Sequence, residues 1–165
     1  MKITRTLQIT EAEFYNYLEN DVINSVENCT KRIIKTKDIK KGLHYTKHGD
    51  DIYSRVDITI LNYERGKLYT SKIKSMSDTI TLSYETSMIE KGLQIIFHQH
   101  IASFENKKQA KLMRMFSEGV YYGRMSDTLY DIQKKIINIR EGIEESTVVQ
   151  KEEHKRLKKL ITKKS

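Results

Sequence analysis

The strongest constraint on the fold of this chain is a row of apolar residues near its C-terminal end. The spacing of three and four residues is unbroken along the row: Tyr122, Met125, Leu129, Ile132, Ile136, Ile139 and Ile143. Residues spaced in this way share one face of an α-helix. The row therefore predicts a long helix that packs on the rest of the domain. A second helical pattern covers residues 107–120, and Gly119 and Gly123 predict a kink or break between the two.

The chain opens with a strand that runs directly into a helix. Residues 3–9 alternate, with Ile3, Arg5, Leu7 and Ile9 on one side and polar residues on the other. Thr10 and Glu13 have the spacing of a capping box, which marks a helix start. Apolar residues then recur every four positions, so the sequence predicts one bent helix or two short ones over residues 11–29.

The middle of the chain alternates short extended segments with turns. The predicted strands cover residues 43–47, 52–63, 68–74, 79–87 and 93–104, and Gly49-Asp50 suits a tight turn between the first two. Sequential strands joined by short turns form an antiparallel meander. Together with the first strand, they predict one curved sheet of six or seven strands.

Composition limits the class of protein. The chain has 165 residues, a net charge of +8 and one cysteine, Cys29, which excludes an intramolecular disulfide. We expect one domain over residues 1–143 and a basic tail over 144–165, either helical or disordered. There is no apolar run long enough to span a membrane and no signal-like start, so we expect a cytoplasmic protein. The segments 31–41 and 151–165 together carry a net +10, which leaves the body of the domain nearly neutral.

The order of strand, helix, meander and closing helix is that of a helix-grip fold, an α+β fold. The opening resembles the START-like superfamily (SRPBCC, birch-pollen-allergen-like) in the strand Ile3 to Ile9, the turn at Thr10, and Phe14, Leu18 and Asp21. More closely, the chain is similar to an uncharacterised domain-of-unknown-function family of low-GC Gram-positive bacteria. That likeness rests on MKITRTLQITEAEFYNYLEN, KKGLHYTK, VDITILNYERGKLYTSKIKS and TITLSYET. The family has no established activity, so the resemblance implies no catalytic residues.

In a helix-grip fold, the sheet and the closing helix can enclose a pocket for a small hydrophobic ligand or a protein partner. The predicted lining is Tyr45, Ile58, Ile60, Ile73, Leu82, Tyr84, Ile95, Phe97, Tyr122, Met125, Leu129 and Ile132. The alternative is that the same side chains fill a closed core. Tyr45 and Tyr84 are informative because a buried phenol needs a polar partner, either in the protein or in a ligand.

Other chemistry is less well supported by the sequence. His98 and His100 share one face of a predicted strand, and we interpret them as a solvated pair, because a metal would need a third ligand from His44 or His48. We find no nucleophile beside a base, no phosphate loop and no cofactor motif, although an enzyme using the same pocket stays open. Nucleic-acid or anionic-surface binding through residues 31–41 and the tail is an alternative, but neither segment contains an aromatic residue. The apolar row of the closing helix would also serve a homodimer.

Overall fold

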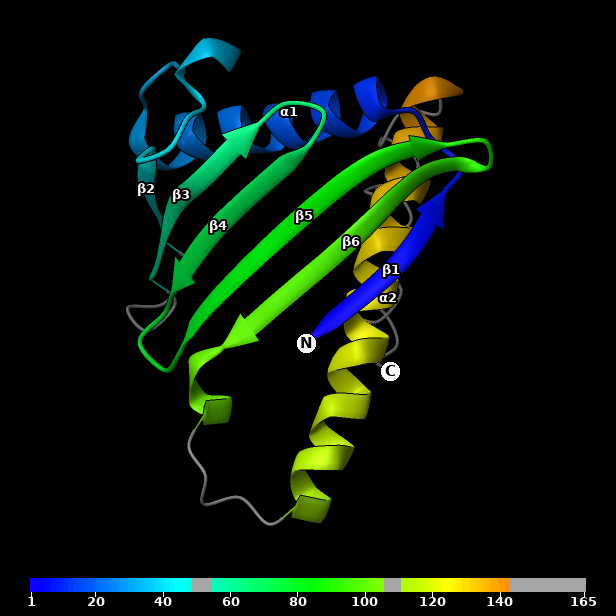
Figure 1. Cartoon of the computed structure of the whole chain (residues 1–165). Helices are drawn as coiled ribbons and strands as arrows, with labels where there is room; N and C mark the ends of the chain where they lie inside the picture. The colour runs from blue at the N-terminus through cyan, green and yellow to red at the C-terminus, as the bar shows by residue number, and fades with distance from the viewer. Residues whose placement is uncertain (49–54, 106–110, 143–165) are drawn as a thin grey trace, which may run out of the picture.

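The structure, a computed structural model, describes residues 1–48, 55–105 and 111–142. In this part of the chain, six strands form one antiparallel sheet in the order β1-β6-β5-β4-β3-β2, accompanied by two α-helices (Figure 1). The strands are β1 Lys2–Leu7, β2 His44–Lys47, β3 Val56–Glu64, β4 Leu68–Lys74, β5 Thr79–Ile89 and β6 Gly92–Ile101. The helices are α1 Glu11–Thr30 and α2 Lys111–Arg140, and short 3₁₀ helices cover Thr36–Asp38 and Ala102–Glu105.

The start of α1 is fixed by the predicted capping box. The backbone N–H of Glu13 donates to the Thr10 hydroxyl at 3.2 Å, and the Glu13 carboxylate accepts from the backbone N–H of Thr10 at 2.8 Å. Both bonds use backbone groups that a helix start would otherwise leave unpaired. The helix runs unbroken to Thr30 and ends on Lys31, which has a left-handed φ of 57°. Of the two predicted arrangements, the single helix is therefore correct.

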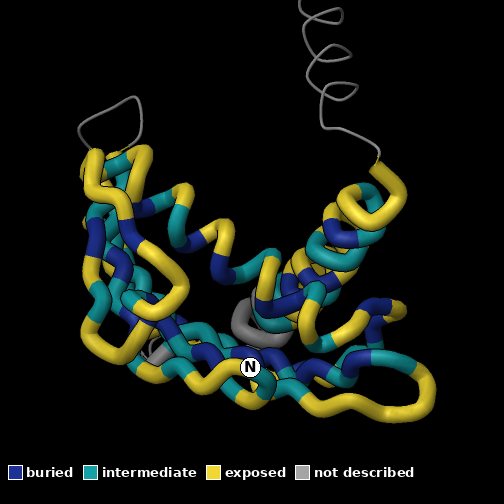
Figure 2. The backbone as a smooth tube through the Cα atoms, turned by 90° about the horizontal axis from the view of Figure 1, so that it is seen from above, coloured by how far each residue is buried: buried dark blue, intermediate teal, exposed yellow. Residues whose placement is uncertain are grey.

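Both helices lie on the same face of the sheet, and the domain core lies between these layers (Figures 1 and 2). We call this the inner face. It carries the inward side chains of all six strands, which include Leu7, Tyr45, Ile60, Tyr84 and Leu93. Register sets these side chains in rows across the sheet: Tyr45 pairs with Ile58 and Tyr84 with Phe97. The outer face carries mainly Thr, Ser, Lys and His, as expected for an antiparallel sheet with one solvated side.

The strands differ from the prediction mainly at their ends. β5 continues to Ile89, and β6 starts at Gly92 and stops at Ile101, where a 3₁₀ helix replaces the predicted end of the strand. Six strands, the lower of the two predicted numbers, are present in the described residues. The predicted turn at Gly49-Asp50, the first residues of the predicted 52–63 strand and the tail from residue 143 lie outside the described residues.

The predicted break in the closing helix is wrong. α2 is continuous through Gly119 and Gly123. A glycine inside a helix costs only about 1 kcal/mol relative to alanine, which a long helix can accommodate. Side chains placed at these two positions would meet nothing within 4 Å, so no close packing explains the glycines.

Candidate functional site

The twelve residues predicted to line a pocket lie on the inner face and on α2, and we call them the inner-face site. Eight are buried: Tyr45, Ile58, Ile60, Tyr84, Ile95, Phe97, Met125 and Leu129. Ile73, Leu82 and Ile132 are half-buried, and Tyr122 is 40% exposed. Burial therefore decreases across the site, from a packed floor to a partly exposed margin.

The row on α2 is only partly covered. Met125, Leu129 and Ile136 are buried, but Ile139 is 68% exposed, and Ile143 lies outside the described residues. Together with the exposure of Tyr122, this corrects the expectation that the whole row is buried. The first turns of α2 extend past the start of β1, beyond the edge of the sheet (Figure 1), whereas Ile139 lies in the last turn of the helix.

The floor of the inner-face site is a cluster of aromatic rings. Tyr84 stacks on Tyr69 with ring centroids 6.3 Å apart and meets Phe97 at 4.7 Å. Phe14, from α1, approaches the Tyr84 ring edge-on at 5.8 Å. Rings in these arrangements add favourable electrostatic contacts to the burial of apolar surface. Tyr84 is thus fixed at the centre of the floor by three neighbouring rings.

Three phenol groups on this floor differ in their polar neighbours. Ser25 of α1 partly offsets the effect of burial on the pKa of Tyr45, and Ser71 does the same for Tyr69. In the described part of the chain, no hydrogen bond reaches the Tyr84 hydroxyl, although that residue is only 6% exposed. Burial raises the pKa of all three phenols above the usual range, so all three are neutral hydroxyl groups at neutral pH.

The negative charge of Asp21, an exposed residue of α1, adds to the effect of burial in raising the pKa of Tyr45, Tyr69 and Tyr84. Tyr17 and Ser25 lie one turn before and one turn after Asp21, on the same side of the helix. Tyr17 also interacts with Tyr84, and Ser25 with Tyr45. This side of α1 therefore carries polar side chains.

The sequence analysis missed a buried carboxylate on the opposite side of α1. Glu19, 5% exposed, accepts hydrogen bonds from the Tyr63 hydroxyl and the Arg65 guanidinium. Arg65 also donates to Asn16 at 2.8 Å and lies over the Tyr15 ring. Each polar group here is satisfied by another, so we interpret the cluster as the means of fixing α1 to the β3–β4 turn. Glu19 lies outside the four-residue apolar repeat of α1, so nothing in the sequence indicated that this acid would be buried.

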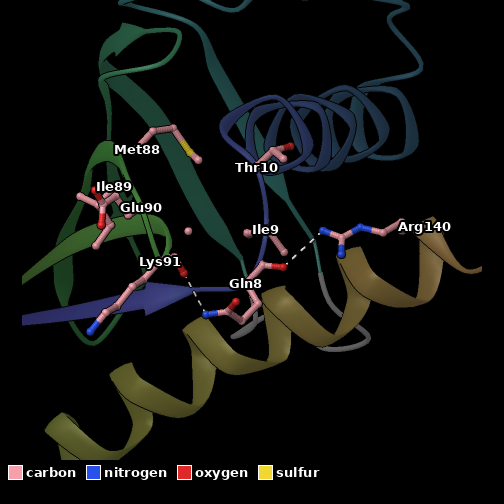
Figure 3. A pocket seen from close by; sticks show the side chains of 9 residues that line it. Gln8, Ile9, Thr10, Met88, Ile89, Glu90, Lys91 and Arg140 are labelled. Carbon is pink, nitrogen blue, oxygen red and sulfur yellow. Dashed lines mark hydrogen bonds between the residues drawn. The ribbon is translucent and has the colours of Figure 1, made fainter.

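A shallow hollow of about 330 Å³ lies where the β5–β6 turn meets the start of α1 and the end of α2 (Figure 3). The Gln8 side chain donates to the Lys91 carbonyl at 2.9 Å, and Arg140 donates to the Gln8 carbonyl at 3.3 Å. Arg140 also makes two bonds of 2.7 Å to the Glu13 carboxylate. Mainly because of the Arg140 bonds, the pKa of Glu13 is lowered to about 2. These polar groups already hold α2 against the β1–α1 turn.

A second hollow, of about 380 Å³, lies beside the β4–β5 turn, and Asp78 is one of the residues that line it. Asp78 accepts bonds from the backbone N–H groups of Thr79 and Ser103 and from the Ser103 hydroxyl. The Ser103 bond is the main cause of a lowered pKa at Asp78. None of the twelve residues of the inner-face site lines either hollow.

The histidines occupy separate parts of the sheet. His98 lies on β6 and pairs with Glu85 at 3.3 Å, and His100 follows two residues later. His44 lies on β2, and three strands separate β2 from β6, so it cannot complete a metal site with them. Within the described residues, no group of three His, Cys, Asp or Glu side chains is placed to hold a metal ion.

The basic segment 31–41 is attached to the core by two of its apolar residues. Ile34 and Ile39 are buried, whereas all six of its cationic side chains are exposed. Ile33, by contrast, is 78% exposed. The charges therefore extend from an anchored segment into solvent. Neither described helix is both long enough and apolar enough to cross a membrane.

Known structures of the same architecture are numerous but distant in sequence. SA2116, a protein of unknown function from Staphylococcus aureus, matches with a TM-score of 0.57 and 12% identity over 86% of this chain and 94% of that one. Ara h 8.0201 matches with a TM-score of 0.55 and 12% identity over 84% and 97%. MLL2253 from Mesorhizobium loti matches with a TM-score of 0.52 and 9% identity over 84% and 96%. At these identities the likeness concerns the fold alone, and it confirms the predicted helix-grip architecture.

Sequence comparison gives a family. The search of curated proteins found no match. One family model, described as a domain of unknown function (DUF3284), matches residues 1–118, a range that contains α1, the whole sheet and the first turns of α2. The expected likeness to an uncharacterised domain family is thereby confirmed. The chain belongs to the family of the domain of unknown function DUF3284.

Proposed function

We propose that this domain binds a small ligand with an apolar body at the inner-face site, between the sheet and the two helices. The observation that carries the proposal is the change in burial along one continuous apolar surface. Leu93 and Ile95 on β6 are fully buried, whereas Leu82 on the neighbouring strand β5 and Ile73 on β4 are only partly buried. A partly exposed apolar surface next to an aromatic floor is suited to a ligand that would complete its burial.

The side chains of the surface favour a small molecule. The margin is formed by separate elements, with Ile73 on β4, Leu82 on β5 and Tyr122 on α2. The floor below it is lined by aromatic rings and a few hydroxyl groups, the combination found in pockets for small apolar molecules.

A neutral fluorescent probe tests the proposal. N-phenyl-1-naphthylamine fluoresces more strongly in apolar surroundings, and we expect saturable enhancement with the wild-type protein. Leu82→Trp fills the margin of the site and should reduce this binding at least tenfold. The matched control is Leu68→Trp, because Leu68 is also a half-buried strand leucine but points to the outer face.

Both variants should keep the circular dichroism spectrum and the melting temperature of the wild type within a few degrees. The absence of saturable binding to the wild type would contradict the proposal. So would equal loss of binding in the two variants, because the probe would then not be bound at the inner face.

A further inference from the structure

Segment 31–41 connects the end of α1 to β2 and is attached to the domain at defined points (Figure 1). Ile34 and Ile39 are buried in the core. The Asp38 carboxylate accepts a hydrogen bond of 2.8 Å from the backbone N–H of Lys35, across the 3₁₀ turn Thr36–Asp38. These contacts hold the backbone of the segment against the domain, so its exposed side chains belong to a defined surface.

Most of the exposed side chains of this segment are cationic. All six of its cations are exposed: Lys31, Arg32, Lys35, Lys37, Lys40 and Lys41. Its one acid, Asp38, is half-buried and bonds to the Lys35 backbone. No carboxylate in residues 1–48, 55–105 and 111–142 forms an ion pair with any of the six cations. The segment therefore presents a net charge of +5, whereas the chain outside it and outside residues 151–165 carries a net −2.

Ile33 lies among these cations. It is 78% exposed, the largest exposed fraction of any large apolar side chain in the part of the chain that the structure describes. The next residue, Ile34, is buried, so one isoleucine anchors the segment and the other faces water. A single exposed apolar residue is ordinary on a protein surface. An isoleucine among six cations is a more specific feature, because it combines the two forces that bind a protein to a membrane surface.

This combination favours a lipid surface over nucleic acid, the other large polyanion. Lys and Arg side chains are attracted to the phosphates of both. An aliphatic side chain leaves water when it enters the acyl region of a membrane, whereas binding to single-stranded nucleic acid relies on aromatic rings that stack on the bases. The most exposed apolar residue of the segment is Ile33, and the segment contains no aromatic residue.

We propose that segment 31–41 is a docking surface for membranes that contain anionic lipids. The six cations lie against the phosphate headgroups, and Ile33 enters the boundary between headgroups and acyl chains. The β2 edge of the sheet then faces the membrane, and α2, which packs along β1 at the opposite edge, lies away from it. This inference does not depend on the ligand proposed for the inner-face site.

Cosedimentation of the full chain with sucrose-loaded vesicles tests the proposal. One set of vesicles consists of phosphatidylcholine alone, and the other contains equal parts of phosphatidylcholine and phosphatidylglycerol. We expect the wild type to partition onto the anionic vesicles at least about tenfold more strongly than onto the neutral ones. The preference should decrease as salt is raised, because salt screens the attraction between exposed charges.

Ile33→Ser tests the apolar contribution and should lower partitioning onto the anionic vesicles by about tenfold. The matched control is Met76→Ser, because Met76 is also an apolar residue with a high exposed fraction, 69%. Met76 belongs to the β4–β5 turn, near the Lys47 end of β2, whereas segment 31–41 leads into the His44 end of that strand. Met76→Ser should therefore leave the partitioning unchanged.

Lys35→Gln combined with Lys37→Gln tests the charge contribution. Each cation near an anionic surface contributes about fivefold, so the double variant should lower partitioning by about tenfold or more. The matched control is Lys134→Gln combined with Lys135→Gln, which removes the same charge from exposed positions of α2 and should leave partitioning unchanged. All of these variants change exposed side chains and should keep the melting temperature of the wild type within a few degrees.

Three outcomes would overturn the proposal. The first is equal partitioning of the wild type onto the two kinds of vesicle. The second is an anionic preference that neither Ile33→Ser nor the Lys35→Gln, Lys37→Gln variant reduces, because docking would then not use this segment. The third concerns single-stranded poly(U) RNA, which at a phosphate concentration equal to that of the lipid should not displace the protein from the vesicles. Displacement would identify nucleic acid as the preferred partner.

Discussion

The two ends of the inner face are built differently. Near the β1–α1 turn, Leu7 and Leu93 face each other across β1 and β6, and both are completely buried. Along the same face toward the β4–β5 turn, Ile73, Ile80 and Leu82 keep part of their surface exposed. We call the first region the sealed end and the second the half-exposed end. Both are apolar, so composition alone does not explain the difference.

The position of α2 explains the contrast. Three polar residues of α2, spaced seven apart, bond to β1 and to the turn after it. Ser126 accepts from Arg5 at 2.9 Å, Gln133 accepts from the Gln8 backbone at 2.6 Å, and Arg140 bonds to Glu13. These bonds hold α2 along the β1 edge of the sheet, away from β4 and β5. A polar row beside the apolar row thus decides which part of the inner face the helix covers.

The largest expected contrast comes from shortening one leucine at each end. Leu93→Ala should lower the free energy of unfolding by about 3 to 4 kcal/mol, because it leaves a cavity at a fully buried site. Leu82→Ala removes the same atoms from a half-exposed site and should cost about 1 kcal/mol. Urea denaturation of both variants at pH 7 measures the difference. Equal losses would mean that the half-exposed end is packed as firmly as the sealed end.

The glycine of the β5–β6 turn offers a second test of the sealed end. Gly92 has a φ of +126°, and a Cβ atom there would lie 2.2 Å from the Leu7 carbonyl oxygen. Gly92→Ala should therefore lower the free energy of unfolding by about 2 to 3 kcal/mol through backbone strain and overpacking. Gly42 is the matched control, with a φ of +91° and nothing within 4 Å of its Cβ position.

Gly42→Ala should show only the backbone strain, about 1 kcal/mol. Urea denaturation again provides the comparison. If both alanine variants lose the same stability, the close approach of β1 to the β5–β6 turn contributes nothing to the sealed end.

The features that the sequence predicted best depend on neighbours along the chain. The capping box of Thr10 and Glu13 spans four residues, and the alternation of β1 and β6 follows from the pleat of a strand. The inner-face row through Tyr84 and Phe97 could be predicted in the same way, since only the side of each strand had to be known. These local patterns were enough to give the order of elements and hence the helix-grip fold.

The features that were missed depend on contacts between distant segments. Glu13 and Arg140 are 127 positions apart, and nothing local distinguishes Arg140 from the other basic residues of α2. The spacing of Ser126, Gln133 and Arg140 was not recognised as a pattern, because the apolar row beside it dominates this part of the sequence. Arg5, assigned to the inward side of β1, was the one signal that a polar group of α2 would face the strand.

The smallest expected effect concerns the ion pair at the sealed end, and its size depends on pH. The pKa of Glu13 in the folded protein is about 2, below the usual value of 4.5. The pairing therefore stabilises the fold fully above about pH 4.5, and this stabilisation is lost as the pH falls toward 2. Arg140→Ala should raise the pKa of Glu13 toward 4.5, leaving it slightly low because the Thr10 bonds remain.

At pH 7, Arg140→Ala should lower the free energy of unfolding only slightly, because Arg140 is nearly half-exposed and solvent screens the pair. The difference in the free energy of unfolding between wild type and variant should decrease as the pH falls from 4.5 to 2, because the wild type loses the pairing in this range. Lys135→Ala removes an exposed charge from the same helix, and its difference from the wild type in the free energy of unfolding should not decrease over this pH range. NMR titration of the Glu13 carboxyl group and urea denaturation at several pH values measure both effects. A Glu13 pKa unchanged in Arg140→Ala would mean that the Thr10 capping bonds alone lower it and that α2 is held at the sealed end by its apolar row.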